Sequence, residues 1–201
     1  MENLLQDTAG GADSDESLMR RFQAGDGDAF DDLFDRYSAH LINFAFRSLR
    51  SKEEAEDCTQ ETLLRVHGAK DRYDPSRPFR PWLYSIASRL VSNRLRHKKR
   101  HPILSFFMGG EDDVESPLPI DPPDHPRDRP EQTAEKSRLV ETVRSSLAKL
   151  PDNQRTAVLL ARFEEMSYED IAHVLDVSVP SVKSLLFRAR QTLKNDLQPH
   201  S

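Results

Sequence analysis

The chain has 201 residues, with 29 lysines and arginines against 34 aspartates and glutamates, so its formal net charge is −5. Hydrophobic residues make up 36% and charged residues 31%, a balance that suits small helical units and is too apolar for wholesale disorder. No apolar run approaches the ~18 residues of a membrane span, and the acidic N-terminus does not resemble a signal peptide. A lone cysteine excludes an internal disulfide framework. We therefore expect a cytoplasmic protein.

The first part of the chain has the periodicity of amphipathic helices. Residues 1–14 are polar, and we expect them to be disordered. From Glu16 onward, apolar residues recur at three- and four-residue spacings. A turn at 25–28 divides this pattern into two helices, and Asp28 is expected to be the N-cap of the second helix. The positions expected to be buried are Leu18, Phe22, Phe30, Leu33, Phe34, Tyr37, Leu41, Phe44 and Ala45.

Two further helices follow in this part. Ser51 and Glu54 have the spacing of a capping box, which predicts a third helix that ends at Gly68. A loop rich in proline and arginine comes next. Pro81 is expected to be the first residue of a fourth helix, because proline is tolerated where no backbone donor is needed.

Charge is strongly segregated along the chain. Residues 77–101 contain eight lysines and arginines and no acid, residues 109–133 contain eight acids and two arginines, and residues 177–195 are again free of acids. Two basic blocks separated by an acidic block predict a protein that binds a polyanion at two places. A solvated helix face remains the alternative for either block alone.

A proline-rich segment divides the chain. Six of the 13 prolines lie between residues 117 and 130, a density that excludes a regular helix, and the surrounding acids repel one another. We therefore predict an all-α protein with two small helical domains, 15–101 and 134–201, joined by a flexible acidic linker over 102–133.

The C-terminal part has the pattern of a helix-turn-helix. A helix is expected to stop at Pro151, and another to cover 154–163. Ser167 caps a short helix, residues 175–178 form a turn, and a longer helix follows. In a helix-turn-helix the second helix enters the major groove of DNA. The outer face of this helix is expected to carry Ser181, Lys183, Ser184, Phe187, Arg188 and Arg190. The alternative, a hairpin that serves only a core, leaves an exposed Phe187 among cations unexplained.

These segments resemble a known family. Residues 148–155, 166–172 and 181–190 are similar to region four of bacterial sigma factors of the extracytoplasmic-function (ECF) type. Residues 28–37, 55–66 and 82–87 are similar to region two of the same family. The resemblance covers the chain from about Glu16 to Leu197, apart from the acidic linker. It implies a protein that binds core RNA polymerase, directs it to promoters and helps to open the DNA.

The resemblance also implies roles for particular residues. Contact with the clamp helices of the largest polymerase subunit would come from Asp57, Gln60, Glu61 and Leu64, although an ordinary amphipathic helix explains the same pattern. The melted minus-ten element would be held by Arg80, Trp82, Arg89, Asn93 and Arg96. Non-specific phosphate attraction would come from Arg94, Arg96, Lys98, Lys99 and Arg100. The minus-thirty-five element would be bound by Ser181, Lys183, Ser184, Phe187, Arg188 and Arg190, next to the flap of the second largest subunit.

Some features stay open at this point. Trp82 suits a stacking surface for unpaired bases and a core anchor equally well. Arg89 stands where the family usually has Asn, so minus-ten discrimination here differs or reduces to phosphate binding. The acidic linker is either an RNA mimic near the polymerase cleft or a solubilising spacer. The resemblance implies an anti-sigma partner and a nucleoid location within the holoenzyme.

No catalytic or metal site is expected. His97 and His101 have a metal-ligand spacing, but the cations between them disfavour a metal ion. We expect neither a cofactor nor enzymatic activity. Two rival functions remain: a stand-alone helix-turn-helix regulator that acts without core polymerase, and a nucleic-acid-processing enzyme, for which no motif is present.

Overall fold

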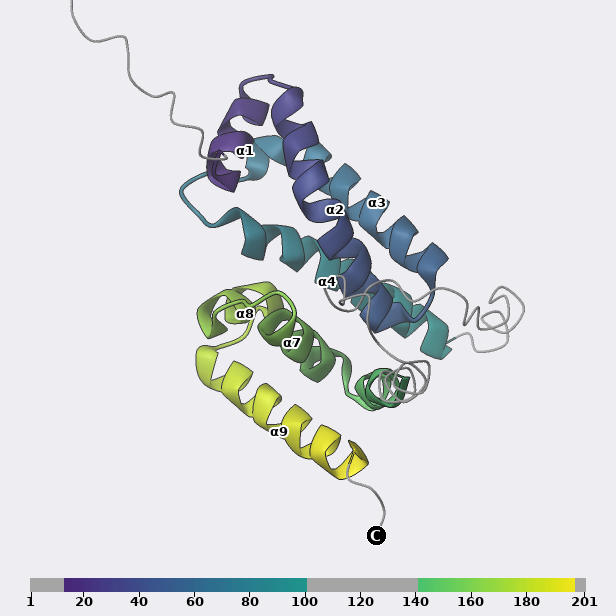
Figure 1. The fold of residues 1–201 in the computed structure, drawn as a ribbon. Helices are drawn as coiled ribbons and strands as arrows, with labels where there is room; N and C mark the ends of the chain where they lie inside the picture. The colour runs from purple at the N-terminus through teal and green to yellow at the C-terminus, as the bar shows by residue number, and fades with distance from the viewer. Residues whose placement is uncertain (1–12, 101–140, 198–201) are drawn as a thin grey trace, which may run out of the picture.

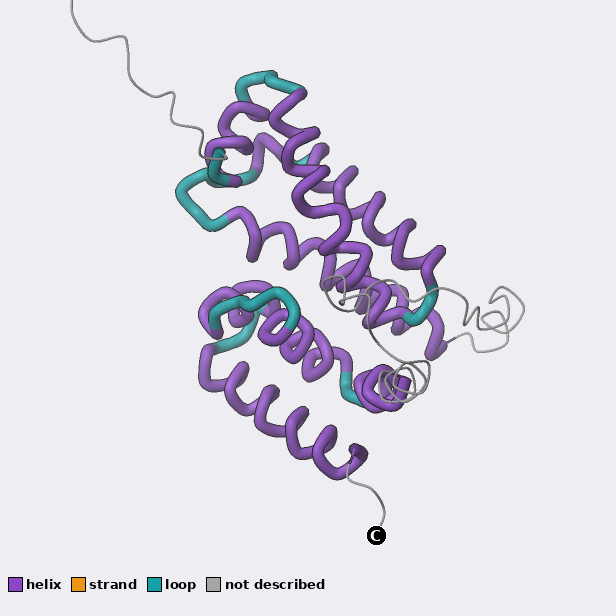
Figure 2. The backbone as a smooth tube through the Cα atoms, viewed as in Figure 1, coloured by secondary structure: helices purple, strands orange, loops and turns teal. Residues whose placement is uncertain are grey.

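The computed structural model describes residues 13–100 and 141–197, and every regular element within these ranges is a helix (Figure 2). The all-α prediction is therefore confirmed for the described residues. None of the helices described has the length and apolar character needed to cross a membrane. In chain order the elements are α1 (Asp15–Gln23), α2 (Asp28–Leu49), α3 (Lys52–Gly68), the short 3-10 helix η1 (Lys70–Arg72), α4 (Phe79–Arg100), a helical stretch over 141–149, α7 (Asp152–Arg162), α8 (Tyr168–Leu175) and α9 (Val179–Leu197).

Helix α2 is the centre of the N-terminal half, where it packs against α1, α3 and α4 (Figure 1). Leu33 and Leu41 on α2 and Leu83 on α4 are almost completely buried. Phe44 meets Tyr84 edge-on, with 5.4 Å between the ring centroids. Burial of each such side chain contributes about 1.5–3 kcal/mol to folding, so the apolar stripes assemble the bundle.

Two details at the start of α2 differ from the prediction. Gly27, not Asp28, is the N-cap residue, and Asp28 begins the helix. The side-chain hydrogen bond at the start of α2 comes from Asp26 instead: its Oδ1 accepts from the Asp28 backbone N–H at 3.1 Å. Phe34 is 43% exposed rather than buried. Its neighbour Leu33 occupies the inward face, and adjacent helical positions point in different directions.

The residues predicted to begin α3 and α4 can be compared with the first residues of these helices in the structure. The Ser51 hydroxyl accepts a hydrogen bond from the Glu54 backbone N–H at 3.2 Å, so the predicted cap of α3 is confirmed. Helix α4 begins at Phe79, and Pro81 is therefore its third residue rather than its first. The Phe79 N–H donates to Glu16 Oε1 at 2.9 Å. Pro81 still lies in the first turn, where its missing N–H costs no helical hydrogen bond.

The C-terminal half contains the predicted helix-turn-helix. The Ser167 hydroxyl caps α8 by accepting from the Asp170 N–H at 3.0 Å. Asp176 ends α8 in the left-handed conformation, with φ 55°. Helix α9 then runs back beneath α7 and α8 (Figure 1). The turn therefore holds α9 with one face against the other two helices and the other face outward.

The two halves pack against each other. Helix α8 lies on α4 and α7 lies on α2 (Figure 1), and the buried apolar residues of both halves form one continuous cluster. This contact is closer than two tethered domains would make. Lys183 and Arg188 on α9 nevertheless remain exposed. The predicted linker over 102–133 lies outside the described residues, and the domain limits 15–101 and 134–201 stay predictions.

Candidate nucleic-acid and protein interfaces

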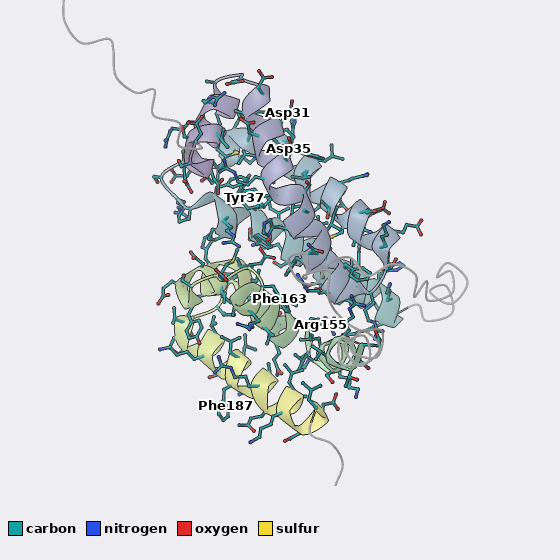
Figure 3. The ribbon with its side chains drawn as sticks, in the orientation of Figure 1. Asp31, Asp35, Tyr37, Arg155, Phe163 and Phe187 are labelled. Carbon is teal, nitrogen blue, oxygen red and sulfur yellow. The ribbon has the colours of Figure 1, made fainter. Side chains whose placement is uncertain are left out.

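The outer face of α9 carries an exposed aromatic ring among cations. Phe187 is 64% exposed, and its side chain lies on the side of α9 away from the rest of the molecule (Figure 3). The opposite face of the helix buries Val182 and Leu186. A shallow hollow on the outer face is lined by Lys183, Ser184, Phe187 and Arg188. These are four of the six residues that the sequence places on this surface, so the predicted grouping is present in the structure.

The remaining two residues lie near the same surface. Ser181 is exposed in the first turn of α9, where its Oγ is 2.9 Å from Ser178 Oγ. Arg190 is exposed one turn beyond Phe187. Within the described ranges no carboxylate forms an ion pair with Lys183, Arg188 or Arg190. A helix face with cations, hydroxyls and an aromatic ring suits contact with phosphates and base edges in a DNA groove.

The predicted minus-ten residues on α4 do not form a single group. Trp82, Arg89, Asn93 and Arg96 share one face of the helix, because their spacings are seven, four and three residues. Arg80 lies on the other side of α4 and turns toward the C-terminal half, where its Nη2 is 3.1 Å from Glu164 Oε2. Four of the five predicted residues can therefore follow one strand, and Arg80 is occupied elsewhere.

Trp82 packs on other aromatic rings with one side and lines a cleft with the other, and a stacking role for its exposed side stays a prediction. The side chain is half-buried against Tyr73, with 4.8 Å between the ring centroids, and it contacts Phe79 at 5.8 Å. Its remaining surface lines a cleft of about 540 Å³ between the two halves. The walls of this cleft include Arg77 and Arg89 from the N-terminal half, and His173 and Asp176 from the C-terminal half. The indole is thus anchored on one side and accessible on the other.

The basic end of α4 is less available to DNA than its charge predicts. Arg94 lies between α4 and α3, with its Nη2 3.4 Å from Glu61 Oε2 and its Nη1 3.2 Å from the Glu54 carbonyl oxygen. Lys98 forms an ion pair with Glu54. Lys99 Nζ is 3.0 Å from Asp152 Oδ1 on α7. These pairs were not expected, because the sequence pattern shows acid-free blocks but not which acids lie beside them in the fold.

One face of α3 is left uncovered. Asp57, Gln60 and Leu64 are exposed, and Glu61 is half-buried beside Arg65 and Arg94. Leu64 is 73% exposed, the highest value among the large hydrophobic side chains of the described residues. The four positions fall at helical spacings on one side of α3, where two acids and an amide surround an apolar side chain; that this patch binds a protein stays a prediction.

Arg155 is a central residue that the sequence analysis missed. It is 4% exposed, and it donates to the backbone oxygens of Leu147 at 2.9 Å, Ala148 at 2.6 Å and Leu150 at 2.9 Å. A fourth bond, at 3.3 Å, reaches the Ser48 carbonyl oxygen on α2. Burial lowers the pKa of this guanidinium, while Asp152 opposes the shift. The sequence offers one hint of these hydrogen bonds: Arg155 follows Pro151 closely, and a cation near the C-terminal end of the preceding helix can bind its free carbonyl oxygens.

Histidine, cysteine and acidic side chains were compared for metal-ligand clusters within the described ranges. Among residues 13–100 and 141–197, no three histidine, cysteine, aspartate or glutamate side chains gather closely enough to hold a metal ion. His101, one of the two histidines with metal-ligand spacing, lies outside the described residues.

Comparisons with known proteins agree with the division into two halves. Residues 33–101 match the family described as Sigma-70 region 2, and residues 141–193 match Sigma-70, region 4. The chain is 32% identical over 197 residues to the RNA polymerase sigma-H factor of Pseudomonas aeruginosa, covering 93% of this chain and 95% of that protein. It is 31% identical over 182 residues to the ECF RNA polymerase sigma factor SigW of Bacillus subtilis, covering 90% and 95% respectively.

Solved structures share this arrangement of helices. CnrH, solved in complex with the cytosolic domain of CnrY, superimposes with a TM-score of 0.67 at 25% identity, covering 94% of this chain and 100% of that chain. The sigma factor RpoE of Bartonella quintana, solved with the anti-sigma factor NepR, gives a TM-score of 0.64 at 22% identity, covering 86% and 98%.

Proposed function

Because this chain belongs to the ECF family of RNA polymerase sigma factors, we propose that its three exposed surfaces divide the work of promoter recognition among themselves. A sigma factor directs core RNA polymerase to promoters, so the chain supplies binding surfaces and the polymerase supplies the chemistry. The observation that carries the proposal is that region 2 and region 4 both match, in order, on halves that each present a surface suited to a macromolecule.

The face of α3 is proposed to bind core RNA polymerase. Its residues are Asp57, Gln60, Glu61 and Leu64. An apolar side chain that is 73% exposed at the centre of such a patch fits a protein partner, because the buried centre of an interface is apolar and its rim polar. The clamp helices of the largest polymerase subunit are the proposed partner.

The two DNA elements are assigned to α4 and α9. The single-stranded minus-ten element is proposed to follow Trp82, Arg89, Asn93 and Arg96, with the indole as a stacking surface and the arginines on phosphates. Arg80, the fifth residue of the prediction, lies on the other side of α4 against Glu164 and is left out of this surface. The minus-thirty-five element is proposed to receive α9 in its major groove, with Ser181, Lys183, Ser184, Phe187, Arg188 and Arg190 on the contacting side.

A regulatory partner is also proposed. CnrH, which is similar over nearly all of this chain, was solved with the cytosolic domain of CnrY. We therefore expect an anti-sigma protein for this chain as well, acting in the cytoplasm, with the holoenzyme on the nucleoid. Pull-downs from resting cells that recover no inhibitory partner would count against it.

Sequencing of transcripts made on genomic DNA by core RNA polymerase with and without the purified chain tests the proposed function. We expect start sites that depend on the chain and share two sequence elements upstream. If no stable complex forms with core polymerase and no chain-dependent transcript appears, the proposal is wrong. A specific gel shift in the absence of core polymerase would instead favour the stand-alone helix-turn-helix regulator.

A further inference from the structure

Helix α1 holds the segment that connects η1 to α4, against both of which it packs (Figure 1). The Gln23 side-chain amide donates to the Lys70 carbonyl oxygen at 2.7 Å and to the Tyr73 carbonyl oxygen at 2.8 Å. At the other end of the segment, Glu16 Oε1 accepts from the Phe79 backbone N–H at 2.9 Å. Two side chains of one helix therefore fix the beginning and the end of residues 70–79.

Helix α1 is itself anchored to the bundle. Its apolar face is buried, and Asp15 accepts hydrogen bonds from the Arg36 guanidinium and the Tyr37 hydroxyl of α2. A backbone group that is bound by a side chain on a fixed helix is held more precisely than one bound by a loop. Helix α1 is therefore a suitable support for the segment that it binds.

The segment depends on these bonds because it has few of its own. Residues 73–78 lie between η1 and α4 and form no regular element. Pro75 and Pro78 have no backbone N–H to donate. The hydrogen bonds from Gln23 and to Glu16 therefore supply constraints that a helix would otherwise provide.

The two residues held by α1 at the ends of this stretch carry the rings that support Trp82. Tyr73, whose carbonyl oxygen binds Gln23, has its ring centroid 4.8 Å from that of Trp82. Phe79, whose N–H binds Glu16, has its ring centroid 5.8 Å from the indole. Both rings are buried, and they also meet each other edge-on at 5.8 Å. The orientation of the indole therefore depends on backbone groups that α1 fixes.

We propose that Gln23 and Glu16 are positioning residues for promoter-strand binding: through the backbone of Tyr73 and Phe79 they hold the Trp82 indole so that its accessible side can stack on an unpaired base. This inference rests on the proposed function of Trp82. It adds a helix that lies before the region 2 match, which begins at residue 33. A strand that binds only the correctly oriented indole has its apparent affinity lowered by the fraction of molecules in which the indole has moved.

The first test compares Gln23→Met with Gln191→Met. Methionine keeps the length of the side chain and removes both donors, and Gln191 is an exposed glutamine on α9 that serves as the matched control. The probe is a fluorescent fork DNA with the minus-ten element, but not the minus-thirty-five element, of a promoter that the wild-type holoenzyme transcribes. When it is titrated with holoenzyme made from each variant, we expect about fivefold weaker binding for Gln23→Met and no change for Gln191→Met.

The same exchange in a Trp82→Ala background separates positioning from a general loss of structure. Trp82→Ala alone is expected to weaken fork binding about tenfold, because base–aromatic stacking is lost. Gln23→Met is expected to have no further effect in that background, since no indole is left to position. Trp82 is also the one tryptophan of the chain. In the free chain, its quenching by acrylamide should therefore rise in Gln23→Met, while the circular dichroism signal of the helices stays that of wild type.

A second pair of variants acts at the other end of the segment and guards against misfolding of the first. Glu16→Gln keeps an oxygen that can accept from the Phe79 N–H, so it is expected to bind the fork as wild type does. Glu16→Met removes the acceptor and is expected to bind about two- to threefold more weakly.

Two results would overturn the inference and leave the proposed function intact. One is that Gln23→Met and Glu16→Met both stay within about 1.5-fold of wild type while Trp82→Ala weakens fork binding. The other is that Gln23→Met weakens binding equally with and without the indole. If Trp82→Ala itself leaves fork binding unchanged, the stacking role proposed for Trp82 is wrong, and the inference is wrong with it.

Discussion

Replacing Arg155 with methionine is expected to destabilise the protein by about 3 kcal/mol. Methionine keeps most of the apolar volume but removes every donor, so four backbone oxygens lose the bonds that Arg155 makes to them. Each unsatisfied buried acceptor costs about 1–3 kcal/mol. The sum is reduced for two reasons. The Leu147 oxygen still accepts from the Leu150 N–H at 3.2 Å, and the mutation also removes a desolvated cation, whose burial already lowers its pKa.

The measurement is urea-induced unfolding followed by circular dichroism at 222 nm. Arg162→Met is the matched control, because Arg162 is exposed on the same helix, and its effect is expected to stay within about 0.5 kcal/mol. Arg155→Lys is expected to fall between the two, since an ammonium cannot reach the same set of oxygens with a planar fork. If Arg155→Met unfolds within about 0.5 kcal/mol of the control, the four hydrogen bonds do not carry the stability assigned to them.

Three further predictions concern single side chains. Leu64→Glu is expected to weaken binding to core RNA polymerase at least about tenfold, because it puts charge on an apolar group that is 73% exposed; Lys52→Glu, on the same helix, is the control, and an unchanged Kd would remove Leu64 from the interface. Phe187→Ala is expected to weaken promoter binding by the holoenzyme by about 1–3 kcal/mol without altering the unfolding midpoint, with Asn195→Ala as control; loss of stability instead would show that Phe187 belongs to the core. Burial raises the pKa of the Cys58 thiol to about 11, above the ~8.5 of an unfolded thiol. The unfolded state therefore loses this proton first, so stability should fall as the pH rises from about 8.5 to 11, and Cys58→Ala should reduce that fall; rapid reaction of the folded protein with a disulfide reagent at neutral pH would contradict the burial.

Most of the helices were predictable because their signals are local. Ser51 and Ser167 cap helices three residues from the backbone groups they bind. The stripe and the exposed face of α9 follow from the spacing of its own residues. Asp28 shows the limit, since two aspartates within the same turn compete for the capping role and the sequence pattern does not rank them.

The packing of one half on the other was not predictable in the same way. The Arg80–Glu164 pair spans 84 residues and the Arg155–Ser48 bond spans 107, and no periodicity relates such positions. The ion pairs of the basic block at the end of α4 were not predictable for the same reason, because they too join residues far apart in the sequence. Arg94 and Lys98 lie in a run without acids, yet α3 brings Glu54 and Glu61 to them. A charge count along the chain therefore overestimates the cations available to DNA.

The distribution of the Arg155 hydrogen bonds bears on whether the halves can part without unfolding. Three of the four connect α7 to residues 147–150, at and just after the end of the 141–149 helix, and one crosses to Ser48. Separation of the halves breaks the crossing bond and the Arg80–Glu164 pair, and it exposes apolar residues that the two halves bury in one cluster. The C-terminal half keeps its internal bonds and the buried stripe of α9. Parting of the halves therefore leaves the C-terminal fold intact but costs the free energy of the apolar contact that the two halves share.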